Sequence, residues 1–96
     1  MSRAIRVNEV TFHTAPALDR ARGLLGWVSF VVDGRLRLSS IAVRRTLEGR
    51  MALSFPARID GAGNQRFYIR PLDNHTRHEI ERQVFQAIGL EIKNLR

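Results

Sequence analysis

The sequence predicts an α+β domain, in which a meandering antiparallel sheet of about five strands carries one C-terminal amphipathic helix on one face. Strand-like runs, most of them with alternating apolar and polar residues, recur through residues 3–70. From Pro71 onward the apolar spacing is that of a helix. The 96 residues suffice for a single domain, 1–96. Because one helix covers only part of such a sheet, the fold leaves sheet surface for a second subunit.

The first strand is expected at residues 3–13. Its apolar positions change from odd to even between Val7 and Val10, which predicts a β-bulge. The connection that follows, residues 14–23, shows little periodicity, and within it we expect a short helical turn at 17–22.

The centre of the molecule is predicted to be a hairpin of two strands, residues 24–33 and 35–45. The stretch 26–32 is apolar at nearly every position, which suits an inner strand or one that a partner buries. An Asp-Gly dipeptide follows it and predicts a two-residue turn. In the second strand the apolar phase changes after the pair Ser39-Ser40, which predicts another bulge.

Two further strands are expected at residues 50–56 and 65–70, and Pro56 ends the first or places it at a sheet edge. The segment between them reads Asp-Gly-Ala-Gly-Asn. A phosphate-binding loop would follow a strand and open a helix, whereas these glycines lie between two strand-like runs. Glycine and asparagine tolerate the positive φ that a hairpin tip needs, so we predict a turn.

The helix is expected over residues 76–89. Apolar residues recur at helical spacing within it. Thr76 and Glu79 have the spacing of a capping box, and Gly89 is a stop signal.

Charge is distributed unevenly along the chain, which has 16 basic and nine acidic residues and a net charge of +7. Residues 1–72 hold twelve arginines and five acidic residues, whereas residues 73–96 are balanced. A GC-rich genome would account for much of the preference for arginine over lysine, but it would not account for the net sign. The excess on one part of the fold is typical of a protein that binds a polyanion, and a solvated basic face is the alternative.

The predicted turn at residues 60–64 brings basic and aromatic side chains together. Arg58 precedes the turn, and Arg66, Tyr68 and Arg70 follow it at alternating positions of one strand face. Arginine forks fit phosphate oxygens and base edges, and a tyrosine ring gives a stacking surface. We therefore predict a nucleic-acid contact here, with the polar outer face of a hairpin as the alternative.

The sequence offers little for other chemistry. His75, His78 and Glu79 cluster, but His75 precedes the expected N-cap, so helical spacing fails and no metal site is predicted. Trp27 is expected in the core, with a dimer interface as the alternative. The chain has no cysteine, and no apolar run near its start suits a signal peptide, so a cytoplasmic protein is expected. Neither catalysis nor a cofactor is predicted.

Part of the chain resembles a known family. The segment from Gly26 to about Ile92 is similar to SpoVG, the stage V sporulation protein G family of bacterial septation regulators. The residues that carry the resemblance are Phe55-Pro56-Ala57-Arg58, Arg70-Pro71-Leu72, Asn74, Thr76 and Arg77. The element from Pro71 to Arg77 is the part of this match that is most specific to the family.

The resemblance implies a small dimeric regulator that binds DNA and, in some members, RNA. The positions that match the family's nucleic-acid contacts are Arg58, Asn74, His75, Thr76, Arg77 and His78. The chain departs from the family pattern where apolar Ile59 follows Arg58, and where His78 and Glu79 replace Gly and Lys. A different function also stays open, a dimeric protein-interaction module whose basic surface binds an acidic protein.

Overall fold

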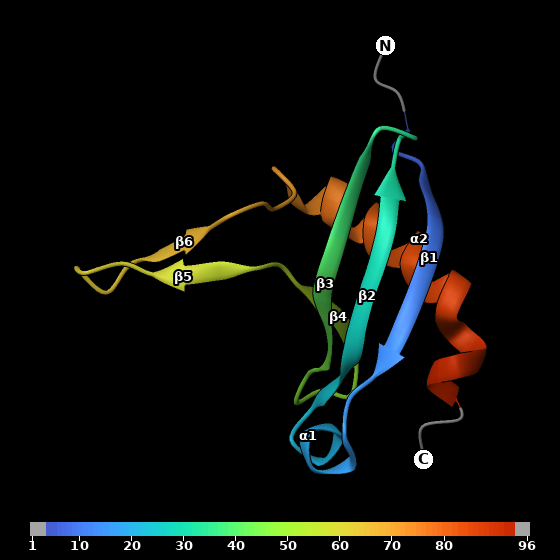
Figure 1. Ribbon diagram of the computed structural model, residues 1–96, viewed down its shortest axis with the longest axis horizontal. Helices are drawn as coiled ribbons and strands as arrows, with labels where there is room; N and C mark the ends of the chain where they lie inside the picture. The colour runs from blue at the N-terminus through green and yellow to red at the C-terminus, as the bar shows by residue number, and fades with distance from the viewer. Residues whose placement is uncertain (1–3, 94–96) are drawn as a thin grey trace.

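The computed structural model describes residues 4–93, and side chains up to residue 89. Its elements, in chain order, are β1 (Val7–Thr14), α1 (Ala17–Ala21), β2 (Leu24–Val32), β3 (Leu36–Arg45), β4 (Met51–Ser54), β5 (Ala57–Ile59), β6 (Gln65–Phe67) and α2 (Asn74–Lys93). An antiparallel sheet has the order β1-β2-β3-β4, while β5 and β6 pair only with each other. Figure 1 shows α2 crossing behind the four-stranded sheet and the β5–β6 hairpin projecting away from it.

The predicted α+β class is confirmed, but the predicted sheet of about five strands is wrong. The strand expected at residues 50–56 is broken, because β4 ends at Ser54 and the chain leaves the sheet before β5. Pro56 lies in this break, where its missing N–H removes no sheet hydrogen bond. The strand expected at 65–70 is shorter and ends at Phe67. One more backbone bond follows it, from the Tyr68 N–H to the Pro56 oxygen at 2.9 Å, and the chain then leaves its partner strand.

The local features predicted for the first three strands are confirmed. Asp33 and Gly34 both have positive φ, 53° and 65°, as the two-residue primed turn requires. The first bulge lies at Glu9, where the β1–β2 register shifts. The second lies at Ser40, opposite a shift in the β2–β3 register. The short helical turn is α1.

The hydrophobic core lies between the sheet and α2. Ile80, Val84 and Ile88 recur along one side of the helix and are at most 5% exposed. They pack on a cluster of sheet residues that includes Phe30, and Phe55 belongs to the same cluster. Trp27, expected in the core, does not belong to it and is half-buried.

A glutamine of α2 holds the outer strand β1. The Gln83 side chain accepts a hydrogen bond from the Val7 N–H at 2.8 Å and donates one to the Ile5 oxygen, also at 2.8 Å. The side-chain amide of Gln83 thus bonds one backbone N–H and one backbone carbonyl oxygen at the outer edge, as the backbone of a neighbouring strand would.

Two charged residues of α2 do the same for β4, the other edge. The Leu53 N–H donates to a Glu81 carboxylate oxygen at 2.9 Å, and Arg77 donates to the Leu53 carbonyl oxygen at 2.7 Å. Helix α2 therefore spans the sheet and occupies backbone groups at both edges, which otherwise invite pairing with another chain.

The helix is longer than predicted at both ends. It begins at Asn74, and the Asp73 carboxylate accepts the Thr76 N–H at 2.7 Å. The cap is therefore Asp73, and the predicted capping box of Thr76 and Glu79 is wrong. The helix also continues through Gly89 to Lys93.

Candidate nucleic-acid interface

The projecting hairpin, residues 56–70, is called the arm below. Its cross-strand pairs are Ala57 with Phe67, Arg58 with Arg66, and Ile59 with Gln65. Partners across a two-stranded ladder point to the same side, so Arg58 and Arg66 share one face. Strand alternation places Tyr68, two residues after Arg66, on that same face. The structure thus brings three of the predicted site residues together.

The tip of the arm is closed by a carboxylate. Asp60 accepts the backbone N–H groups of Ala62 and Asn64 and the Arg66 Nε–H, each at 2.9 Å. These bonds lower the pKa of Asp60, that from Arg66 most strongly. Gly63 has a φ of 85°, and its N–H donates to the Asp60 carbonyl oxygen. The predicted turn is confirmed, and the amides that a phosphate loop would offer already bind Asp60.

The arm carries more positive than negative charge. It holds three arginines against one carboxylate, and Asp60 bonds only the Nε of Arg66. Within the described residues neither Arg58 nor Arg70 makes an ion pair. Free guanidinium groups are therefore exposed along the arm.

Arg70 does not lie where the alternation predicted. We expected it beside Arg66 and Tyr68, but its guanidinium lies over the Phe67 ring, 5.3 Å from the centroid. The Tyr68 N–H still bonds the Pro56 oxygen and so continues the ladder to Tyr68, but Arg70 lies beyond this bond, where alternation no longer fixes the direction of a side chain. Arg70 and Phe67 form a cation–π pair on the arm.

The arm also exposes apolar side chains. Ile59 is 66% exposed and Tyr68 is 69% exposed, while Phe67 and Ile69 are 40% exposed. Figure 1 shows β5 and β6 standing clear of the sheet, whereas Ile69 lines a hollow with body residues that include Phe55 and Ile80. A two-stranded hairpin is marginally stable alone, which favours a partner that covers part of it.

The predicted site residues at the start of α2 have different surroundings. Asn74, His75 and His78 are exposed, while Thr76 is held by Asp73. The side chains available to a ligand are therefore those of Asn74, His75 and His78.

Arg77 is bound within the protein. Besides its bond to the Leu53 oxygen, its Nε lies 3.6 Å from a Glu81 carboxylate oxygen, and its guanidinium lies 6.0 Å from the centroid of the Phe55 ring. Its side chain is 40% exposed. These contacts give Arg77 a structural role, and a contact to nucleic acid would compete with them.

The histidine cluster also differs from its prediction. Because α2 begins at Asn74, His75 and Glu79 are one turn apart on the helix, and the spacing argument against a metal was wrong. Glu79, however, accepts hydrogen bonds from Arg82 and Gln83, which lower its pKa to about 2. Among the side chains of residues 4–89, no group of three or more His, Cys, Asp or Glu is placed to hold a metal ion.

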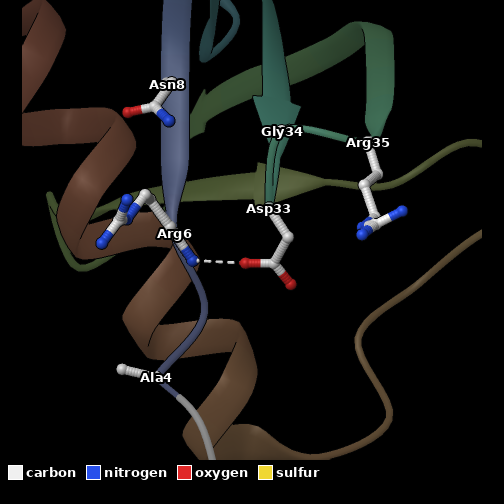
Figure 2. Close-up of a pocket in the computed structure, with 6 residues that line it drawn as sticks. All are labelled: Ala4, Arg6, Asn8, Asp33, Gly34 and Arg35. Carbon is white, nitrogen blue, oxygen red and sulfur yellow. Dashed lines mark hydrogen bonds between the residues drawn. The ribbon is translucent and has the colours of Figure 1, made fainter.

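Besides the arm, a hollow with basic side chains lies between the start of β1 and the β2–β3 turn (Figure 2). Asp33 accepts the backbone N–H of Arg6 there at 2.9 Å. Figure 2 shows the side chains of Arg6 and Arg35 extending to opposite sides of Asp33. They do not converge on one ligand, so the arm is the better candidate.

No protein-family model matches the chain, and no curated protein matches it. The resemblance to SpoVG therefore rests on the sequence motif alone. In the part of the chain that the structure describes, no helix is both long and apolar enough to cross a membrane.

Sequence reasoning missed two residues of the arm. Asp60 closes the tip, and the signal was an Asp at the start of a glycine-containing turn, where its carboxylate reaches amides two and four residues on. Phe67 was treated only as an apolar strand residue, although Arg70 lies three positions later, near enough to cover its ring.

Proposed function

We propose that the chain is a small dimeric regulator that binds nucleic acid through the arm. The observation that carries this proposal is the pair Arg58 and Arg66, which lie opposite each other on one exposed face with Tyr68 beside them. Guanidinium groups bind phosphate oxygens through two parallel hydrogen bonds, and a tyrosine ring stacks on a base.

The cross-strand arginine pair itself favours an anion. Like charges directly opposite on neighbouring strands destabilise the ladder. Asp60 offsets this repulsion at Arg66, but Arg58 makes no ion pair with the side chains of residues 4–89. A phosphate between the two guanidinium groups would relieve the repulsion, and binding would then stabilise the arm.

The start of α2 gives the proposed interface a second part. Asn74, His75 and His78 are exposed soon after the arm ends. The amide of Thr76 is not available to a ligand, because its N–H already bonds the Asp73 carboxylate. We therefore assign the second part to these three side chains and not to the helix terminus.

The proposed dimer uses the apolar residues of the arm. Ile59 and Phe67 lie on the face opposite the arginine pair, because they alternate with Arg58 and Arg66 along their strands. A second copy that covers this face would remove exposed apolar area from water and leave Arg58 and Arg66 outward.

Titrating the protein into fluorescent double-stranded DNA and single-stranded RNA, with anisotropy followed at several salt concentrations, tests the proposed function. The Arg58→Gln/Arg66→Gln variant should bind more weakly, and its salt slope on duplex DNA should fall by about 1.8 if two phosphate contacts are lost. The control is Arg22→Gln/Arg35→Gln, which removes the same charge from exposed arginines outside the arm. If both variants lose the same affinity for nucleic acid, the loss reflects net charge alone, and the assignment of the binding site to the arm is overturned.

The exposed apolar residues of the arm favour one alternative, a module that binds an acidic protein. Ile59 and Tyr68 are two-thirds exposed, more than phosphate contact requires. This alternative expects no binding to either nucleic acid at low salt. It also expects a partner retained from nuclease-treated lysate by the wild type and lost by an Ile59→Ser variant.

A further inference from the structure

The four-stranded sheet has a face that α2 does not cover, called the open face below. It is the face turned toward the viewer in Figure 1, because α2 passes behind the strands. Val28 and Phe30 of β2 belong to the core cluster with α2. Side chains alternate along a strand, so Trp27 and Ser29 point to the open face.

Small side chains lie beside Trp27 on the β3 and β4 side of this face. Its register partners are His13 on β1 and Ala42 on β3, and Ala42 pairs in turn with Ser54 on β4. Neither Ala42 nor Ser54 has a side chain larger than that of serine. The indole therefore has flat, low surroundings on that side, which suit the approach of another planar ring.

The charge of the open face is positive. Arg37 and Arg44 are both exposed and flank Ala42 along β3 on this face. The only acidic residue in strands β1 to β4 is Glu9, and it is neutralised by Arg37 at 2.9 Å. Arg44 lies two positions along β3 from Ala42, the register partner of Trp27, and makes no ion pair within the described residues.

We propose that the open face is a second nucleic-acid site, which holds single-stranded RNA or DNA by stacking a base on Trp27 and binding phosphate at Arg44. This inference rests on the proposed function in its ligand class but assigns a surface separate from the arm. Aromatic rings on a basic sheet hold single strands because an unpaired base can leave its neighbours and stack on protein. Bases inside a duplex are already stacked, so the duplex is the weaker ligand.

The charge argues against a second copy as the occupant. Two open faces packed together would bring Arg44 and Arg37 of each copy into one low-dielectric interface with only Glu9 to offset them. A polyanion instead satisfies these groups and releases counterions. A ligand on this face would account for the position of Trp27, which is half-buried and does not belong to the core cluster.

The test uses Trp27, the only tryptophan in the chain, as its own probe. Intrinsic fluorescence of the full chain is followed while a short single-stranded oligouridylate or oligothymidylate is added, with a duplex of equal length as the comparison. We expect quenching that saturates with the single strand and much weaker quenching with the duplex. A polyglutamate of equal charge is the third probe, and equal quenching by it would assign the face to an acidic protein and overturn the proposal.

Two variants on one strand give a matched pair. Arg44→Gln removes the open-face charge, whereas Arg45→Gln removes an exposed arginine that pairs with Met51 and points to the other face. The affinity for the single strand should fall several-fold in the Arg44→Gln variant and less in the Arg45→Gln variant. By anisotropy, Trp27→Ala should lose about tenfold in affinity for the single strand, as loss of one stacked base predicts. Trp27→Phe keeps a ring and should retain most of the affinity, which separates stacking from damage to the fold.

The arm variant Arg58→Gln/Arg66→Gln separates this site from the proposed function. Saturable quenching that survives in this variant supports an independent open-face site. If oligonucleotide binds by anisotropy but leaves the fluorescence unchanged, the open-face site is overturned and the arm stands. If quenching disappears with the arm arginines, the open face is not a separate site and the proposal fails.

Discussion

The body of the protein and the arm are stabilised in different ways. In the body, α2 buries Ile80, Val84 and Ile88 against the sheet, and its side chains bond the backbones of both edge strands. The arm is organised by its own turn, in which Asp60 binds nearby amides and Arg66. Substitutions in the body should therefore change stability, whereas substitutions in the arm should change binding.

A matched pair of phenylalanines gives the largest expected contrast. Phe30 is completely buried in the body, and Phe67 is 40% exposed on the arm. We expect Phe30→Ala to lower the free energy of unfolding by about 3–5 kcal/mol, because it leaves a cavity in the core. Phe67→Ala should cost about 1 kcal/mol or less, since it loses little burial and one exposed cation–π contact. Urea denaturation followed by circular dichroism measures both.

An equal loss in the two variants would break the distinction between body and arm. A cost of Phe67→Ala that grows with protein concentration would instead show that the arm is buried in the dimer. That outcome would support the proposed dimer face.

A second comparison sets Arg77 of α2 against Arg58 of the arm. Arg77→Met keeps the aliphatic stem but removes the bond to the Leu53 oxygen, and we expect a loss of about 1–2 kcal/mol in the free energy of unfolding. Arg58→Met should leave stability unchanged within about 0.5 kcal/mol and should weaken DNA binding. Thermal unfolding and anisotropy on both variants make the comparison.

The opposite result would restore the role that the resemblance gives to Arg77. If Arg77→Met keeps wild-type stability but loses DNA binding, its guanidinium acts on a ligand and not on β4. The structural assignment of Arg77 would then be wrong.

The two regions also show which features could be predicted from the sequence and which could not. The Asp33-Gly34 turn, the two bulges and the turn at Asp60 were predictable, because each depends on residues close together in the chain. The departure of β5 and β6 from the sheet was not, because alternating residues predict a strand but do not say which strand pairs with it. The role of Arg77 depends on Leu53, 24 residues away, and no local pattern carries that information.

Candidate site residues follow the same rule. Arg66 and Tyr68 share a face as predicted, since strand alternation is local, whereas the pairing of Arg58 with Arg66 across the ladder was not predicted. Trp27 was expected in the core because apolar residues surround it in the sequence, and only the position of α2 shows which face of β2 is covered.

The smallest expected effect concerns acid. Hydrogen bonds from Arg82 and Gln83 lower the pKa of Glu79 from 4.5 to about 2 in the folded protein. The charged carboxylate therefore contributes stability that is fully present above about pH 4.5 and is lost as the pH falls through about 2. Glu79→Gln should unfold at a lower temperature than wild type at neutral pH, and the difference should shrink steadily below pH 4.5.

Asp60 provides the corresponding test on the arm. Its pKa is also lowered, chiefly by Arg66, so acid should loosen the tip of the arm over a range below its ordinary value. Because the arm has its own turn, Asp60→Asn should leave the acid dependence of global unfolding as in wild type, whereas Glu79→Gln should reduce it. Hydrogen exchange at the Ala62 and Asn64 amides, which bond the Asp60 carboxylate, reports the local event. If Asp60→Asn changes global acid unfolding as much as Glu79→Gln does, the arm and the body unfold as one unit.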